Sequence, residues 1–251
     1  MTGRVAATAL ALVTAMAAVG CGTSAPTTSA DLDDFADIPG IGRTRIDVPR
    51  PTGLESAPCR DGDPLPPSTD ETTAERVAGL RSAGLFADRG DVSDAALAAE
   101  VDQHLEALWG DDLAPDDPMR DLAVAEQDPA RVLWVDLEAD VAGGNDVYVA
   151  TLDQLAGISV GAFDPTGVSE TWAGAEGPIT VDLDLDSGHR QLHPAYYEDW
   201  IDPGILVGIN EAIADSGRRF ELVRAFDQTA VILALADPER EALEARGWCF
   251  E

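Results

Sequence analysis

The sequence predicts an α+β domain in which antiparallel hairpins form a sheet and helices pack on one face of that sheet. Three observations predict this class. Two amphipathic helical patterns come first, segments that alternate between apolar and polar residues follow them, and a helix-start signal recurs after those segments. We therefore expect a helical pair over residues 71–128 and three strand–strand–helix units over residues 129–251, all within a single domain at 71–251.

The helical pair is indicated by apolar residues at helical spacing. Val77, Leu80 and Leu85 form a modest apolar stripe in the first segment. In the second segment, Ser93 stands where an N-cap residue is expected, directly before Asp94. The stripe that follows consists of Leu97, Val101, Leu105 and Leu108. Residues 110–130 contain acidic residues followed by proline, and we expect a loop with at most a short helix there.

The first two strand–strand–helix units have the same plan. Residues 131–150 alternate as two strands around a Gly-Gly-Asn turn, and Thr151 can cap a helix that follows. Residues 179–195 form a second pair of strands around the turn DSGH. Asp202 and Pro203 then occupy the preferred cap and first positions of a helix. The apolar face of that helix consists of Ile205, Leu206, Ile209 and Ile213.

The third unit closes the chain. Residues 219–235 read as two strands, RRFELVRAF and TAVILAL. Asp237, Pro238 and Glu239 start a last helix that ends near Gly247. The three units share a pattern but no sequence, so a duplication remains a hypothesis.

The composition excludes some functions. The chain has 47 acidic and 16 basic residues, a net charge of −31, and every basic residue among the 16 is arginine. A field of this sign repels phosphate backbones and anionic lipid, so we expect no nucleic-acid partner. It favours solubility and cationic partners. Both a salty habitat and a coding bias against lysine are compatible with this composition.

The amino terminus carries the most specific signal. An apolar run from Val5 to Val19 follows Arg4, and at 15 residues it is shorter than the roughly 20 that span a membrane. The run ends in Ala18-Val19-Gly20-Cys21. This tetrapeptide resembles the lipobox of bacterial lipoproteins, although Ala18 stands where leucine is usual. The resemblance implies a signal peptide at 1–20, cleavage before Cys21 and acylation of its thiol, with palmitate among the expected lipids.

The next segment fits such an anchor. Residues 21–70 begin with a Ser/Thr/Pro-rich and then acidic stretch, which we interpret as a lipid-anchored tether and an irregular lead-in. Ordinary secretion with an accidental cysteine is the alternative. If Cys21 is acylated, Cys59 and Cys249 remain as an even pair, and in an oxidising compartment they are expected to form a disulfide. Two free thiols are the alternative.

An acidic stretch at 181–189 raises the question of a metal site. Asp182, Asp184 and Asp186 precede a glycine, but an EF-hand count from Asp182 places serine at position six and histidine at position twelve, so both key positions fail. Strict alternation with aliphatic residues instead predicts a strand with a solvated acidic face. Asp136, Glu138 and Asp140 repeat this pattern, and the six carboxylates would share a face if the two strands were neighbours.

Histidines and a serine motif suggest catalysis. His189 and His193 lie on the same hairpin as Asp182, Asp184 and Asp186, and together these five could hold a metal or exchange protons. Water-exposed histidines are the alternative. The residues GISVG at 157–161 match the nucleophile elbow, but Ser159 falls at the end of an expected helix, without the parallel sheet that this motif requires.

An aromatic and acidic segment, AYYEDWIDP, is the other candidate site. Tyr196, Tyr197 and Trp200 lie beside Asp199 in a chain with only 6% aromatic residues. Such residues suit a groove for a sugar, a peptide or a cation, whereas the alternative is that the rings seat the following helix on the sheet.

These observations lead to one main hypothesis and two others. We expect a non-enzymatic, lipid-anchored protein outside the cell membrane, without a cofactor, that binds an envelope protein, a glycan or a cationic ligand. The second hypothesis is a metal-dependent hydrolase that uses the acidic and histidine hairpin at 182–193. The third is a structural or inhibitor-like lipoprotein without a small ligand.

Overall fold

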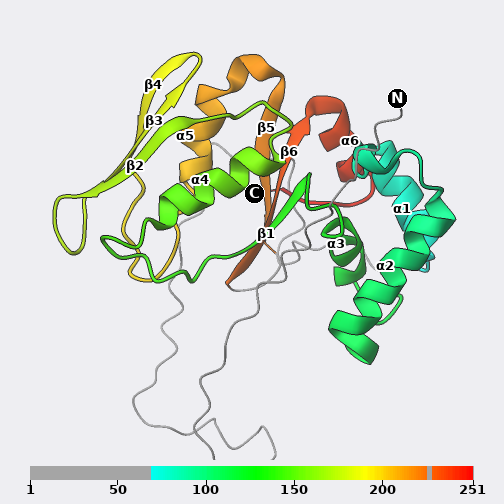
Figure 1. Ribbon diagram of the computed structural model, residues 1–251. Coiled ribbons are helices and arrows are strands. Elements are labelled where there is room, and N and C mark those ends of the chain that lie inside the picture. Colours follow the sequence, from blue (N-terminus) through cyan, green and yellow to red (C-terminus); the bar gives the residue numbers. More distant parts are fainter. Residues whose placement is uncertain (1–68, 225–227, 251) are drawn as a thin grey trace, which may run out of the picture. The chain divides into compact units, whose positions relative to one another are not determined.

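The computed structural model describes residues 69–224 and 228–250 (Figure 1). Within these residues the chain forms six α-helices and two three-stranded antiparallel sheets, with helices packed against the sheets. This arrangement confirms the α+β class. The predictions made for the first 68 residues lie outside the described part of the chain. They are the signal peptide, the acylation of Cys21, the tether and the pairing of Cys59. Cys249 is disulfide-bonded, and its pairing with Cys59 stays a prediction.

The helical part comprises α1 (Thr73–Ser82), α2 (Asp94–Trp109) and α3 (Met119–Ala125), with short 3-10 helices η2 (Ala87–Arg89) and η3 (Gly110–Asp112) between them. Thr72 and Glu75 form a capping box at the start of α1. Ser93 caps α2 by accepting a hydrogen bond from the N–H of Ala96, as its position predicts. Leu108 departs from the expected stripe, because its side chain lies 60% exposed near the end of α2.

The first sheet has the order β1 (Val132–Asp136), β6 (Thr229–Ala236) and β5 (Arg218–Arg224). Its two faces serve different cores. One face contributes Val223, Val231 and Leu233 to a core with α1, α2, α3 and α6 (Asp237–Ala245). The opposite face contributes Phe220 and Ile232 to a second core. The central strand β6 is therefore buried on both faces, which explains its continuous apolar sequence.

The second sheet has the order β2 (Thr166–Trp172), β3 (Ile179–Leu185) and β4 (Gly188–Leu192). Its inner face packs on the second core, together with α4 (Val147–Ile158) and α5 (Ile205–Ala212). Figure 1 shows α4 and α5 between this sheet and the strands of the first sheet. The inner face of the β2–β3–β4 sheet is thus buried against the second core.

The first predicted unit differs from the structure in its second strand. The residues predicted as a strand at 146–150 enter α4 instead, and β2 arises in a segment for which we predicted no element. The reason is a longer pattern in which Tyr148, Leu152 and Leu155 recur at helical spacing and are all buried. Glu170 on β2 also accepts a hydrogen bond from the N–H of Tyr148 and so stabilises the start of α4.

The other predicted units agree with the structure. The strands at 179–195 and 219–235 form the hairpins β3–β4 and β5–β6, and a helix follows each hairpin. Asp202 accepts a hydrogen bond from the N–H of Gly204 at the turn that leads into α5. Within the residues that the structure describes, no helix is both long and apolar enough to cross a membrane.

Candidate functional site

The outer face of the β2–β3–β4 sheet is made of polar side chains only, and we call it the polar face. Alternation along each strand produces it, since Val181, Leu183 and Leu192 point inward and are buried. The residues that alternate with these buried ones point to the outer face, and the register of the three strands places them side by side there. These residues are Thr166, Ser169, Thr171, Thr180, Asp182, Asp184, His189, Gln191 and His193.

His189 lies between two carboxylates of the polar face. Its Nδ1 is 3.0 Å from Oδ1 of Asp184, and its Nε2 is 3.1 Å from Oδ1 of Asp182. A neutral imidazole has only one N–H, so both contacts are hydrogen bonds only when the ring carries two protons. Because the His189 side chain is 60% exposed, we expect these pairs to contribute little to stability. Their effect is to fix the orientation of the ring.

The five residues of the predicted metal site do not converge. Asp182, Asp184 and His189 are in contact, but His193 lies about 13 Å further along the strand from His189, by the rise per residue. The Nδ1 of His193 is instead 3.5 Å from the hydroxyl of Thr180. Asp186 lies in the turn after β3. In the described part of the chain, no group of three or more His, Cys, Asp or Glu residues is placed to hold a metal ion.

The expected neighbourhood of six carboxylates does not form. Asp136 belongs to β1 in the first sheet, whereas Asp182 and Asp184 belong to β3 in the second. Glu138 forms an isolated bridge with Trp200 and not with β3. The two acidic strands share a pattern of alternation, but pairing between strands depends on contacts that a local pattern does not contain.

The aromatic segment is built into the fold. Tyr196 packs edge-on against Trp172, with ring centroids 5.7 Å apart, and both Tyr196 and Trp200 pack against the second core. The backbone carbonyl of Asp199 accepts a hydrogen bond from the N–H of Ala139. Burial, and then the charge of Asp202, raise the pKa of the half-buried Tyr197. The packing of these rings corresponds to the structural alternative for the segment.

The serine of GISVG is not placed as a nucleophile. Ser159 is fully buried, and its hydroxyl donates toward the carbonyls of Ala156 and Phe163 and accepts from the N–H of Gly161. Its backbone is helical, with φ −73°, and not that of a sharp strand-to-helix turn. This agrees with the expectation that GISVG is not a nucleophile elbow.

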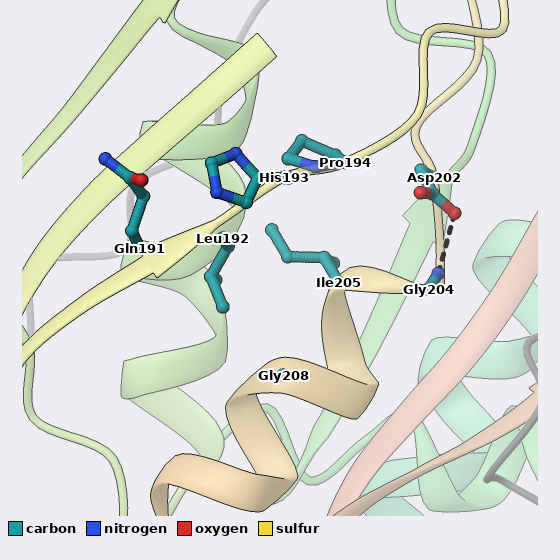
Figure 2. Close-up of a pocket in the computed structure, with 8 residues that line it drawn as sticks. All are labelled: Gln191, Leu192, His193, Pro194, Asp202, Gly204, Ile205 and Gly208. Atoms are coloured by element: carbon teal, nitrogen blue, oxygen red, sulfur yellow. Dashed lines mark hydrogen bonds between the residues drawn. The ribbon is translucent and has the colours of Figure 1, made fainter. Parts of the chain in front are cut away.

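A small pocket lies at the border between β4 and α5 (Figure 2). It has a volume of about 220 Å³. Figure 2 shows Leu192 pointing toward α5, with Ile205 beside it and Gly208 below. Gly208 permits this close approach, because a Cβ at that position would lie 2.6 Å from Cδ2 of Leu192. The rim also includes Gln191, His193, Pro194, Asp202 and Gly204.

Asp202 fixes the loop at one end of this pocket. One carboxylate oxygen accepts the N–H of Gly204 and the other accepts the N–H of Ala195, each at 2.8 Å. The backbone N–H of Asp202 in turn donates to the hydroxyl of Tyr148. Burial raises the pKa of Tyr148 above its ordinary value, so this buried phenol remains neutral. The rim of the pocket is therefore held rigidly from the core.

A second pocket, of about 340 Å³, lies between β1 and α4. Its polar side chains make bonds to nearby groups. Asp136 accepts from the N–H of Glu138, Asn145 donates to Asp140, and the hydroxyl of Thr151 donates to the carbonyl of Val147.

Sequence reasoning missed Gln191, Asp202 and Gly208 as parts of a site. Asp202 was expected as a cap and as an acidic member of the AYYEDWIDP segment, but not as part of a pocket with β4, and no local signal indicates that Gly208 faces Leu192 across two elements. Comparison of the chain with protein-family models, with curated proteins and with solved structures found no match. The geometry of the polar face and its pocket is thus the basis for any functional proposal.

Proposed function

We propose that this chain is a non-enzymatic binding or accessory module of the cell envelope. In this proposal a lipid on Cys21 holds it at the outer face of the cell membrane, and residues 21–70 connect the lipid to the folded domain. The resemblance of Ala18-Val19-Gly20-Cys21 to a lipobox is the single observation that carries the location. The polar face supports the binding role, because it is a flat, solvent-facing array of hydrogen-bonding groups on a rigid sheet.

The charge of the chain supports a particular kind of partner. A net charge of −31 attracts cationic groups and accelerates their encounter with the domain. Asp182 and Asp184 contribute negative charge to the polar face itself. A protein with basic residues on its contact surface is therefore the partner that we favour over a glycan or a free cation.

The location is tested by replacing the anchoring thiol. Cys21→Ser should release the protein from membrane pellets or leave it as an uncleaved precursor, and Thr23→Ser is the matched control because it changes a nearby residue and keeps every cysteine. Normal processing and unchanged pelleting of Cys21→Ser would refute the lipoprotein assignment. Binding is tested by photo-crosslinking in intact envelopes from positions on the polar face, where the absence of any crosslinked partner contradicts the proposal.

A metal-dependent hydrolase remains the second candidate, since Asp182, Asp184 and His189 are in direct contact. A metal bound there would have to displace the imidazole from one of the two carboxylates. Stoichiometric stabilisation by Zn²⁺ or Mn²⁺ that disappears in His189→Ala would favour this candidate. An unchanged melting temperature with either metal would argue against it.

A further inference from the structure

Strand β4 forms one edge of its sheet, and its outward backbone groups can be assigned. Ala173 donates its N–H to the carbonyl of Pro178, so these two residues form a hydrogen-bonded pair at the end of the β2–β3 ladder. Because such pairs occur at every second residue, the backbone groups of Thr180 and Asp182 also face β2. The groups of Val181 and Leu183 therefore face β4, where they pair with Leu192 and Arg190. By the same alternation, the N–H and C=O groups of residues 189, 191 and 193 point away from the sheet.

Gln191 is the centre of this outward row. Its backbone N–H and C=O have no hydrogen-bond partner among the residues that the structure describes, whereas the carbonyl of His189 accepts from the guanidinium of Arg190. An exposed row of such groups is complementary to the main chain of another extended segment.

Two of the other sheet edges carry devices against pairing. On β5, Ser216 bonds both backbone groups of Arg218, and the side chain of Asn210 bonds both backbone groups of Phe220. β2 carries an irregularity between Thr166 and Ser169. β1 has α4 beside it, as β4 has α5. Side-chain caps and bulges of this kind prevent pairing with foreign strands, and β4 lacks them at Gln191.

The pocket beside β4 adds a place for a side chain. Because alternate residues of an added strand point to opposite sides, one set would face the inner side, toward Leu192, Ile205 and Gly208. The other set would continue the polar face, next to Gln191 and His189. Asp182 and Asp184 lie on β3, two strand spacings or about 10 Å from an added strand, and their charge would attract long basic side chains at those positions.

We propose that the β4 edge accepts an extended segment of another protein as an added fourth strand, with apolar side chains toward the pocket and basic side chains on the polar face. This inference rests on the proposed binding function and assigns its site and partner chemistry. A second copy of this chain is the less suitable occupant, since two domains of net charge −31 repel each other.

The test uses the full chain and a defined probe, an acetylated ten-residue peptide of alternating valine and lysine. We expect it to bind and to protect the amides of Gln191 and His193 from hydrogen exchange. A peptide N-methylated at every residue has the same charge but no backbone N–H donor in either strand orientation, and it should bind at least about tenfold more weakly. An alternating valine and glutamate peptide should not bind.

Gln191→Pro is the decisive variant, because it removes an outward N–H and no backbone bond to β3. The side-chain bond from Gln191 to Asp182 is lost in Gln191→Ala as well, so that variant is the matched control. It should weaken peptide binding at least about tenfold, whereas Gln191→Ala, which keeps the N–H, should stay within about twofold. Circular dichroism and melting temperature report whether the proline variant is folded, and the N-methylated peptide tests the same bond without any variant. Equal binding of both peptides, or protection at another edge, overturns the inference.

Two further outcomes separate this inference from the proposed function. If envelope crosslinks form from Ser169 or Tyr197 but none forms from Gln191, the module binds a partner elsewhere and the β4 inference falls. If the valine–lysine peptide binds at β4 but no position crosslinks in envelopes, the edge is competent and the proposed function falls. A dimer that Gln191→Pro abolishes would identify a second copy as the occupant and overturn the inference.

Discussion

Glu221 should make the stability of the domain fall as the pH rises from mildly acidic to neutral. Its side chain is fully buried on β5, and its Oε1 is 2.8 Å from the Nε atoms of both Arg219 and Arg240. Burial raises the pKa of Glu221 to about 7, although the two arginines lower it, and the nearby Glu244 raises it further. Folding therefore favours the protonated form of this carboxyl group.

The sign of the effect follows from the two pKa values. The unfolded chain loses the proton near the ordinary value of 4.5, whereas the folded chain keeps it until about pH 7. Between these values the unfolded state binds fewer protons, so the free energy of unfolding decreases with pH and becomes constant above about pH 7. The difference between the two pKa values corresponds to about 3 kcal/mol as an upper figure, of which about 2 to 3 kcal/mol falls between pH 5 and 8.

Glu221→Gln removes this titration while it keeps the shape of the side chain. Relative to the original protein, the variant should become about 2 to 3 kcal/mol more stable on going from pH 5 to pH 8. Urea unfolding at several pH values measures this difference, and the exposed Glu241→Gln on α6 is the control that should show no trend. A difference between Glu221→Gln and the original protein that does not change with pH would mean that Glu221 stays ionised in the folded state, paired with the two arginines.

The remaining predictions concern strain, a buried ion network and net charge. Val160 has a left-handed φ of 56°, which is unfavourable for a β-branched residue. Val160→Gly should therefore stabilise the fold by about 1 kcal/mol. An unchanged or lower melting temperature of the variant would contradict this. Asp121 is buried and binds Arg76, Arg246 and the indole of Trp248. Asp121→Ala should lower the free energy of unfolding, measured in urea, by about 3 to 5 kcal/mol. A loss below about 1 kcal/mol would show that the network is not needed for stability. The net charge of −31 makes the acidic side chains repel one another, and added salt screens this repulsion. The melting temperature should therefore rise with NaCl as the Debye length falls from about 30 Å at 0.01 M to about 3 Å at 1 M. An unchanged melting temperature would mean that the carboxylates are too far apart to repel.

Local patterns predicted the parts of the fold that local interactions determine. The cap at Ser93, the helix after Asp237 and the hairpins β3–β4 and β5–β6 each depend on residues that are close in the sequence. Alternation in 181–185 also predicted the inner and outer faces of β3 correctly. These features follow from the helical and strand periods and from turn chemistry, which a single sequence contains.

The errors arise where distant residues decide the structure. The strand expected at 146–150 became the start of α4, where the N–H of Tyr148 is bonded by Glu170, 22 residues later in β2. β2 itself has no apolar run, because its outer residues are Thr166, Ser169 and Thr171 and its ladder is irregular. The site was incomplete for the same reason, since the exposure of Gln191 at a sheet edge depends on the order of the strands.

The position of β6 determines when the domain can be completed. Val132 in β1 pairs with Leu233 in β6, roughly 100 residues later in the chain, and β6 is the central strand of a sheet that contributes to both cores. During synthesis the helical part and the β3–β4 hairpin therefore emerge without the surface against which they pack, and neither core can close before the last strand arrives. The order of the strands along the chain thus prevents the domain from closing before its synthesis is nearly complete.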